Sequence, residues 1–377
     1  MRIHGAVLAQ AGVPGPYAET RALEVREIEL GEPGTGEVLV RIVAAGLCHS
    51  DLSVIDGSRI RPLPMLLGHE ASGVVEAIGA DVTDVVPGDH VVLSYVPSCG
   101  GCVPCLSGRP ALCEPAMVSN GAGTLRSGVR RLRSVDDDEP LNHHLGVSAF
   151  ADHAVVSQSS LVRIDPDADL ALAAVLGCAV LTGVGAFVNT ASPRPGSSAV
   201  VFGLGGVGLS GVMGARLAGC HPIVAVDVVD AKLDLAMELG ATHAVRADDP
   251  DALARIREIT AGGGETVVEA VGRTAVLEMA FDATRRGGTT VAAGLPAPDA
   301  VMALSPLRLV AEERTLKGSY MGSGVPRRDV PRLLALARSG RLPIDRLVSG
   351  RLQLDGINEG FDRLADGTAV RQLLTFD

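Results

Sequence analysis

The first third of the chain alternates short apolar runs with turn-forming residues. Runs rich in β-branched residues at 38–45, 72–79 and 89–93 are separated by Gly, Pro and Asp, a pattern that predicts short strands joined by turns. Between residues 114 and 145 the pattern gives way to Gly, Arg and an acidic run at 136–139, which predicts an exposed excursion rather than core. The first lobe is therefore expected to be mainly β.

A different period begins at residue 199, where apolar runs of strand length alternate with segments of helical period. The predicted strands lie at 199–202, 223–226, about 244, 266–269 and 289–292, and the predicted helices at 207–218, 232–239, 252–259 and 274–284. Such alternation predicts a parallel sheet covered by helices on both faces, the doubly wound α/β class.

Two changes of composition mark the ends of this α/β region, near residue 180 and near residue 320. Beyond the second change, the pattern predicts helices at 329–338 and about 358–364 and a final strand at 371–376 that returns to the first lobe. We therefore expect a mainly β domain built from both chain ends and a central α/β domain.

Length and charge limit the possible classes of protein. The chain has 377 residues, of which 47% are apolar, enough for two cores. Its formal charge of −11, with scattered Lys and Arg, argues against a nucleic-acid partner. No apolar run reaches membrane-spanning length and the first residues lack the apolar core of a secretory signal, so we expect a cytoplasmic protein without a membrane partner.

A glycine fingerprint, GxGxxG at 203–208, follows a predicted strand and opens a predicted helix. In a dinucleotide site of this kind Gly203 permits the tight turn, Gly205 lets the backbone approach the pyrophosphate, and Gly208 allows close helix packing. The amides at the start of the helix, Gly206 and Val207, would face the phosphates. A glycine-rich turn without a ligand is the alternative.

Asp227 strengthens the dinucleotide interpretation. It ends the next predicted strand, nineteen residues after Gly208, where a carboxylate can accept hydrogen bonds from an adenosine ribose. Because a carboxylate would repel a 2′-phosphate, the sequence favours NAD over NADP.

Four cysteines lie close together in a Gly-, Ser- and Pro-rich stretch: Cys99, Cys102, Cys105 and Cys113, at spacings of three, three and eight. In a reducing compartment such cysteines are more often metal ligands than disulfides. Four thiolates close a tetrahedral shell around zinc and leave no open position, so this lobe, about 95–115, is predicted to hold a structural zinc. An iron–sulfur cluster is the competing interpretation, because four thiolates alone do not choose the metal.

Cys48, His69 and Cys178 form a second candidate set. Each alone would usually be a packed core residue. Together, two thiolates and one imidazole hold zinc with a fourth position open for water or substrate, a pattern typical of catalytic sites.

These motifs, in this order along nearly all of the chain, resemble the zinc-containing medium-chain alcohol dehydrogenases. The resemblance covers Gly-Leu-Cys-His-Ser-Asp at 46–51, Gly-His-Glu at 68–70, the four cysteines, Gly177-Cys178 with Thr182-Gly183, the glycine fingerprint, and Ile-Asn-Glu-Gly-Phe at 357–361. It implies a GroES-like catalytic domain from residues 1–179 and 321–377, a Rossmann NAD-binding domain at 180–320, and an active site in the cleft between them.

The resemblance also assigns roles around the open metal site. Cys48, His69 and Cys178 would hold the catalytic zinc, giving two zinc ions per chain with the structural one. Glu70 would lie behind the ligands or serve as an alternative ligand, and Asp51 would orient the imidazole of His69.

Ser50 matches the hydroxyl that takes the alcohol proton in this family, since a hydroxyl both donates and accepts. The alternative is a turn-forming serine. Many relatives end the proton relay on a histidine five residues after the first cysteine, where this chain has Ser53. We therefore expect protons to leave through water or through the ribose hydroxyl.

Four further residues match binding positions of the family. His49 and Arg371 would contact the pyrophosphate, Lys232 the ribose, and Tyr95 would wall the alcohol pocket. The alternatives are solvated charges for Arg371 and Lys232 and core packing for Tyr95.

The leading hypothesis is an NAD-dependent zinc enzyme that interconverts an alcohol and its aldehyde or ketone. One alternative is a relative dedicated to a thiol adduct of formaldehyde. Arg59 and Arg61 stand where enzymes for the glutathione adduct carry acidic residues, which disfavours that adduct. A non-catalytic zinc- and dinucleotide-binding protein is the alternative from another class. Because relatives with a long segment after the fourth cysteine tend to be dimers, the excursion at 114–145 predicts a homodimer.

Overall fold

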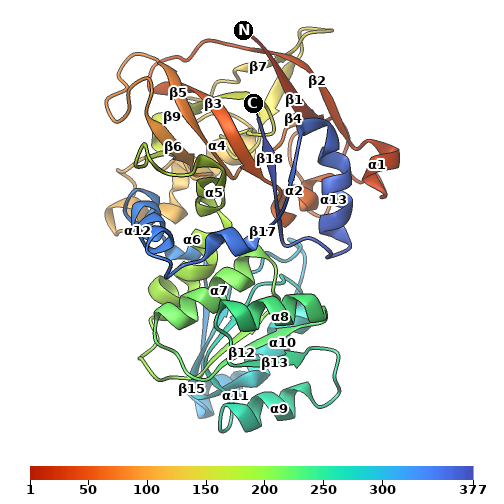
Figure 1. The fold of residues 1–377 in the computed structure, drawn as a ribbon, viewed down its shortest axis with the longest axis vertical. Coiled ribbons are helices and arrows are strands. Elements are labelled where there is room, and N and C mark those ends of the chain that lie inside the picture. Colours follow the sequence, from red (N-terminus) through yellow and green to blue (C-terminus); the bar gives the residue numbers. More distant parts are fainter. Residues whose placement is uncertain (377) are drawn as a thin grey trace. The chain divides into compact units, whose positions relative to one another are not determined.

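The computed structural model describes residues 1–376, and the chain divides into two compact units (Figure 1). Unit 1 comprises Met1–Cys178, Val325–Arg338 and the residues from Ile344 onward, and unit 2 comprises Ala179–Gly324 and Ser339–Pro343. The predicted domain boundaries, after residues 179 and 320, lie one and four residues from the observed ones.

Unit 1 contains a closed barrel and a larger sheet. The barrel order is β1 (Arg2–Leu8), β2 (Leu23–Leu30), β7 (Leu132–Ser134), β8 (Pro140–His143) and β4 (Met65–Leu66). The sheet order is β10 (Leu161–Arg163), β6 (His90–Leu93), β5 (Ala71–Ile78), β3 (Glu37–Gly46), β18 (Arg371–Thr375) and β17 (Val348–Leu352), with β9 (His153–Ser157) also paired to β3. The mainly β character of this lobe and its three predicted strands are confirmed.

The C-terminal strand returns to unit 1 as predicted. β18 pairs antiparallel with β3, with Leu373 opposite Gly46. Figure 1 shows the blue C-terminal strand beside the orange β3. This pairing brings the last residues of the chain next to the segment that leads into Cys48.

The interpretation of 114–145 as an exposed excursion is right for part of the segment and wrong for the rest. It contains helix α4 (Glu114–Ala122) and strands β7 and β8, which complete the barrel. Leu125, Leu132 and Leu141 are buried in the barrel core. The two strands are three and four residues long, too short to show an apolar period. The acidic run 136–139 and residues 126–130 are exposed as expected.

Unit 2 is a parallel six-stranded sheet with helices packed around it (Figure 1). Its order is β13 (His243–Arg246), β12 (Ile223–Asp227), β11 (Ala199–Phe202), β14 (Gly264–Glu269), β15 (Thr284–Ala292) and β16 (Thr315–Gly318). The strand order reverses beside β11, where doubly wound Rossmann sheets bind ligands outside the carboxyl ends of their strands. The predicted doubly wound class is confirmed.

The predicted helices of unit 2 are also present: α7 (Gly206–Leu217), α8 (Asp230–Leu239), α9 (Ala252–Ile259) and α10 (Thr274–Ala283). Edge strand β16 and the preceding α11 (Pro306–Ala311) were not predicted. Both are short and largely exposed, so they lack a buried face that would produce a pattern.

The remaining α-helices are α1 (Tyr17–Thr20), α2 (His49–Ile55), α3 (Val103–Leu106), α5 (Leu170–Ala173), α6 (Ala179–Gly185), α12 (Pro326–Arg338) and α13 (Ile357–Ala365). The last two agree with the helices predicted at 329–338 and about 358–364. Within residues 1–376 no single helix is long and apolar enough to cross a membrane; one bent pair, 170–177 with 179–191, has the length and composition, and most of its residues are buried in the fold.

Candidate metal centres and dinucleotide site

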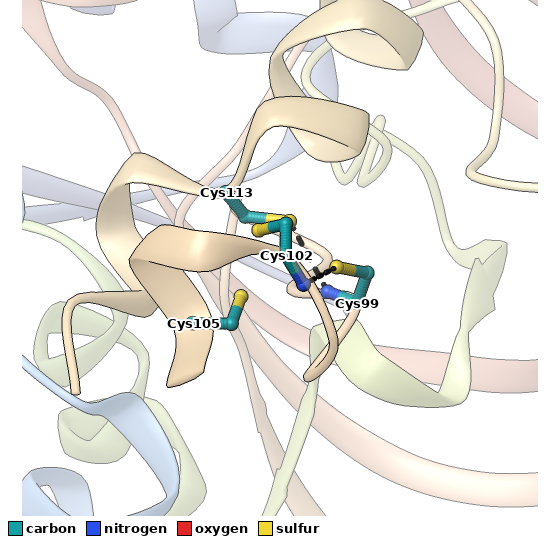
Figure 2. A group of neighbouring side chains, drawn as sticks. All are labelled: Cys99, Cys102, Cys105 and Cys113. Atoms are coloured by element: carbon teal, nitrogen blue, oxygen red, sulfur yellow. Dashed lines mark hydrogen bonds between the residues drawn. The ribbon is translucent and has the colours of Figure 1, made fainter. Parts of the chain in front are cut away.

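The four predicted cysteines converge on one point. Cys99, Cys102, Cys105 and Cys113 place their sulfur atoms within 4.8 Å of one another, around the short helix α3 (Figure 2). The backbone N–H of Cys102 donates to Sγ of Cys99, and that of Cys99 donates to Sγ of Cys113, both at 3.2 Å. Amide donors of this kind stabilise thiolates, the form that ligates metal.

The protonation of this cluster fits a bound cation. Backbone hydrogen bonds from Gly101 and Cys102 lower the pKa of Cys99 to about 6, so its thiolate forms at neutral pH. Burial, with the neighbouring Cys102 thiol, raises the pKa of Cys105 to about 12. Only a cation at the centre would ionise all four sulfur atoms together, as a tetrahedral metal site requires.

The second predicted set also converges. Cys48 lies just before α2, His69 lies between β4 and β5, and Cys178 is the last residue of the first segment of unit 1. Their ligand atoms lie within 4.8 Å of one another, and all three residues are buried. The two cysteines are free thiols. Two sulfur atoms and one ring nitrogen, with no fourth cysteine or histidine in the set, fit a zinc site with an open position.

Hydrogen bonding and nearby charge favour a thiolate at Cys48. The hydrogen bond from Cys178 lowers the pKa of Cys48. Burial opposes this effect, but the positive charge of Arg371 adds to it, and the pKa of Cys48 lies well below its ordinary value. The same contact and burial raise the pKa of Cys178 well above its ordinary value. A divalent metal held by these residues would favour the thiolate form of both cysteines.

Backbone hydrogen bonds fix the segment that carries Cys48. Gly46 N–H donates to Glu70 O at 2.8 Å, Leu47 N–H donates to Gln372 O at 3.0 Å, and Nη1 of Arg371 donates to Leu47 O at 2.6 Å. Glu70, which follows His69, and two residues of the returning β18 thus fix the same end of β3. The candidate ligands are placed by pairings between segments far apart in the sequence.

The Ile-Asn-Glu-Gly-Phe motif at 357–361 supports this segment through helix α13. A Cβ on Gly360 would lie 2.6 Å from Leu47 Cδ2, so a larger residue would displace the neighbour of Cys48. The Asn358 amide accepts from Leu23 N–H at 3.1 Å and donates to Leu23 O at 2.9 Å, imitating a strand partner. The motif has a structural role beside the metal site.

Asp51 links two of the ligands. Its Oδ1 lies 3.0 Å from Nδ1 of His69 and accepts from Gly68 N–H at 3.3 Å, while its Oδ2 accepts from Cys48 N–H at 3.2 Å. Burial opposes a charged imidazole, but the Asp51 carboxylate outweighs it and raises the pKa of His69 well above its ordinary value. The contact fixes the proton on Nδ1 and leaves Nε2 for a metal, the usual arrangement of a carboxylate behind a ligating histidine.

Glu70 and Arg371 form a buried ion pair next to these ligands. Oε2 of Glu70 lies 3.1 Å from Nη1 of Arg371, and neither side chain reaches solvent appreciably. The alternative of a solvated Arg371 is therefore wrong. Its Nε has no hydrogen-bond partner within residues 1–376. Contact with a pyrophosphate stays a prediction.

The other predicted residues of unit 1 surround α2 and His69. Ser50 is half-buried on the first turn of α2 and His49 is exposed. The hydroxyl of Ser53 donates to His49 O at 2.8 Å, a bond within its own helix. The Tyr95 ring is buried and stands perpendicular to the His69 ring, with centroids 5.4 Å apart. Tyr95 thus contacts a predicted ligand directly.

The glycine fingerprint adopts the geometry that its spacing predicts. Gly203 has φ of +83°, a left-handed conformation that favours glycine, at the end of β11. A Cβ on Gly208 would lie 1.6 Å from Gly203 O, whereas a Cβ on Gly205 would meet nothing within 4 Å. Gly206 begins helix α7 and Val207 follows it. The loop combines close internal packing with an open backbone face, as a phosphate site needs.

Asp227 lies at the end of β12, beside this loop. Its Oδ2 accepts from Leu204 N–H at 2.6 Å, and its Oδ1 accepts from the N–H groups of Val228 and Val229 at 2.8 and 3.0 Å. The carboxylate therefore lies at the edge of the fingerprint loop and also holds the loop backbone in place through its hydrogen bond with Leu204. Lys232 is partly exposed in α8, five residues further on. Its contact with a ribose stays a prediction.

Family models match both units. Residues 34–166 match the alcohol dehydrogenase GroES-like domain, and residues 206–339 match the zinc-binding dehydrogenase domain. The putative alcohol dehydrogenase D of Mycobacterium tuberculosis is 40% identical over 378 residues, covering 99% of this chain and 100% of that protein. The chain belongs to the zinc-containing medium-chain alcohol dehydrogenase family.

Two solved structures agree with this assignment. The benzyl alcohol dehydrogenase of Acinetobacter calcoaceticus superposes with a TM-score of 0.92 at 34% identity, with 100% of both chains covered. A putative zinc-binding dehydrogenase of Sinorhizobium meliloti, described as bound to NADP, gives a TM-score of 0.81 at 25% identity over 100% of both chains. The recognised family, its oxidoreductase class, the GroES-like fold of unit 1 and the Rossmann fold of unit 2 are confirmed.

One residue beside this candidate metal centre was missed from the sequence. His144 is buried, and its Nδ1 lies 3.2 Å from Oδ1 of Asp51. With Asp51 and His69 it forms a third group whose possible ligand atoms lie within 4.8 Å of one another. The adjacent pair His143-His144 was a visible signal, but it fell in the segment interpreted as an exposed excursion.

Proposed function

We propose that this protein is a zinc-dependent alcohol dehydrogenase that transfers hydride reversibly between an alcohol and NAD, giving an aldehyde or ketone and NADH. The observation that carries the proposal is the convergence of Cys48, His69 and Cys178 within 4.8 Å in a buried site. Membership of the dehydrogenase family and the open fingerprint loop of unit 2 support it.

The residues of unit 1 would have different roles in this reaction. Zinc held by Cys48, His69 and Cys178 would act as a Lewis acid toward the alcohol oxygen. Asp51 keeps the His69 proton on Nδ1, and the positive charge of Arg371 favours the two thiolates. Ser50 would accept the alcohol proton. Because the Ser53 hydroxyl bonds its own helix, the proton would continue through water or the ribose hydroxyl.

We propose NAD rather than NADP as the cofactor. The Asp227 carboxylate at the end of β12 would accept from the ribose hydroxyls and repel a 2′-phosphate. Lys232 would contact the same ribose, and His49 and Arg371 the pyrophosphate. Initial rates with the two cofactors at matched concentrations test this: a preference for NADP would contradict it.

We propose a second, structural zinc at Cys99, Cys102, Cys105 and Cys113, giving two per chain. Four sulfur atoms leave no ligand position for substrate, so this metal would stabilise the lobe about 95–115. The same sulfur set would also accept iron, so elemental analysis by mass spectrometry tests the choice of metal.

The substrate is expected to be a small alcohol or carbonyl compound that passes Tyr95. A related enzyme acts on benzyl alcohol, so an NADH-coupled panel should compare primary, secondary and aromatic alcohols. Adding low-molecular-weight thiols with formaldehyde tests the alternative of an S-hydroxymethyl substrate, which Arg59 and Arg61 disfavour for glutathione. If zinc-replete protein forms no NADH with any alcohol, the non-catalytic binding protein becomes the better interpretation.

We propose a homodimer formed through unit 2. β16 is the edge strand of its sheet, and exposed apolar side chains lie on and before it: Leu295, Val301, Leu307, Val310 and Leu316. Pairing of two such edges would continue the sheet and cover these residues. Sedimentation that shows a monomer or tetramer would contradict the dimer. We also propose a cytoplasmic location, where ligand thiols stay reduced, with no nucleic-acid or membrane partner.

A further inference from the structure

His144 is held in place by the segment that leads into His69. Its backbone N–H donates to the Ser148 hydroxyl at 2.8 Å, and that hydroxyl donates to Leu66 O at 2.8 Å. Phe150 N–H donates to Leu67 O at 3.0 Å and Ala149 N–H donates to Gly68 O at 3.1 Å. The turn that carries His144 therefore runs alongside the residues just before a metal ligand.

The side chain of His144 reaches the carboxylate behind that ligand. Its Nδ1 lies 3.2 Å from Oδ1 of Asp51, the same oxygen that contacts Nδ1 of His69 at 3.0 Å. The two imidazole rings are perpendicular, with centroids 5.5 Å apart. His144 Nδ1 has no well-aligned hydrogen-bond partner within residues 1–376, so its contact with Asp51 is chiefly electrostatic. Two imidazoles thus approach one carboxylate oxygen from different directions.

We propose that His144 is a positioning residue for the metal site: it fixes the Asp51 carboxylate, and through it the orientation and tautomer of His69. The inference rests on the proposed zinc function of Cys48, His69 and Cys178. Asp51 is fully buried, and an ionised carboxylate there needs every donor around it. Gly68 N–H, Cys48 N–H and Nδ1 of His69 lie within hydrogen-bond distance of this carboxylate, and Nδ1 of His144 approaches it at 3.2 Å from a separate segment.

Core packing alone would explain a buried histidine, but it does not explain this placement. His143, the neighbouring residue, is equally buried, and its Nε2 accepts from Arg131 N–H at 3.0 Å, away from the ligand set. The two adjacent histidines therefore give a matched comparison. Loss of either removes a buried imidazole, and only loss of His144 removes a group from Asp51.

The test compares His144→Asn with His144→Leu. Asparagine and leucine have nearly the same shape, and asparagine keeps a nitrogen donor at the position of Nδ1. His144→Phe, which keeps a ring without nitrogen, serves if the leucine variant does not fold. His143→Leu controls for the loss of a buried imidazole. Zinc release to a chelator is measured for each protein, and the phase from the three-ligand site is assigned with Cys48→Ser.

We expect His144→Leu and His144→Phe to release zinc from this site about tenfold faster than wild type, as for other residues behind metal ligands. His144→Asn should stay within about threefold of wild type, and His143→Leu should match wild type in this phase, by the same reasoning. The visible spectrum of cobalt at this site should change in the leucine and phenylalanine variants only.

Equal zinc release by the leucine variant and wild type would overturn the proposal. Equal impairment of His144→Asn and His144→Leu would also overturn it, because packing alone would then matter. Neither zinc release nor the cobalt spectrum depends on catalytic turnover. If wild type binds zinc here but oxidises no alcohol, the proposed function fails while the role of His144 is still decided. A wild type without metal at Cys48, His69 and Cys178 would overturn both.

Discussion

Nη1 of Arg371 lies 3.1 Å from Oε2 of Glu70 in the buried interior of unit 1. The guanidinium also donates to Leu47 O, one residue before Cys48, at 2.6 Å. The last strand of the chain therefore supplies a positive charge to the thiolate site built by its first third. Neither partner can be removed alone without leaving a buried charge unpaired.

Glu70→Gln is expected to lower the free energy of unfolding by about 3–5 kcal/mol, because it leaves Arg371 charged and buried without its carboxylate. Denaturant unfolding of the zinc-loaded protein measures the change. Glu359→Gln, an exposed substitution on α13, is the control and should change stability by less than about 0.5 kcal/mol. A loss below about 1 kcal/mol for Glu70→Gln would show that the pair is not essential to the fold.

Cys105→Ser should reduce zinc from two ions per chain to one and leave the three-ligand site loaded. One ligand fewer opens the tetrahedral shell, and serine is a poor zinc ligand. Mass spectrometry of the metal content measures the stoichiometry. Cys220→Ser is the control, since Cys220 is buried but belongs to neither ligand set. If Cys105→Ser still holds two zinc ions per chain, the second zinc binds outside the four-cysteine cluster.

Asp227→Asn should weaken NAD binding about tenfold and narrow the preference over NADP, because the repulsive charge is lost. The structure adds a second reason: Asp227 accepts from Leu204 N–H at 2.6 Å and so shapes the fingerprint loop. Fluorescence titration with NADH and NADPH gives both affinities. Asp230→Asn, which removes an exposed carboxylate three residues later, should leave them unchanged. An unaltered cofactor preference in Asp227→Asn would remove Asp227 from the ribose site.

Burial lowers the pKa of His143 from 6.5 to about 3. The imidazole of His143 therefore stays neutral in the folded protein at pH values where it is protonated in the unfolded chain. An unfolded chain binds this proton below about pH 6.5, so the contribution of neutral His143 is present at neutral pH and is lost as pH falls toward 3. Between about pH 7.5 and 5.5 the expected loss is about 1.3 kcal/mol. Unfolding of wild type and His143→Gln at both pH values isolates this loss, which should be absent from the variant. If the free energy of unfolding falls equally in wild type and His143→Gln, the pH dependence comes from other groups.

The parts of the fold with regular periods could be predicted from the sequence. In unit 2 the buried strands and the helices that cover them carry their own apolar patterns, so β11, α7 and β12 were located to within about one residue. Both cysteine sets were found because zinc limits the number and type of its ligands. The fingerprint glycines follow from local backbone requirements in the same way.

Residues placed by pairing between distant segments could not be predicted. β7 and β8 are strands because β2 and β4 lie beside them, and their own sequences are too short to show it. His144 reaches Asp51 only because Ser148 ties its turn to Leu66. The burial of Arg371 likewise depends on β18 pairing with β3. Such contacts depend on tertiary structure, which the apolar pattern does not encode.

Two serines on α2 allow a matched test of the proton path. Ser50→Ala should lower kcat at neutral pH by roughly a hundredfold or more, the contribution typical of a positioned proton-transfer group. Ser53→Ala should leave kcat unchanged, because its hydroxyl already donates to His49 O at 2.8 Å within the helix. Steady-state oxidation of an alcohol found in the substrate panel measures both. If the two variants turn over alike, Ser50 is not the acceptor, and the proton leaves the alcohol directly to water.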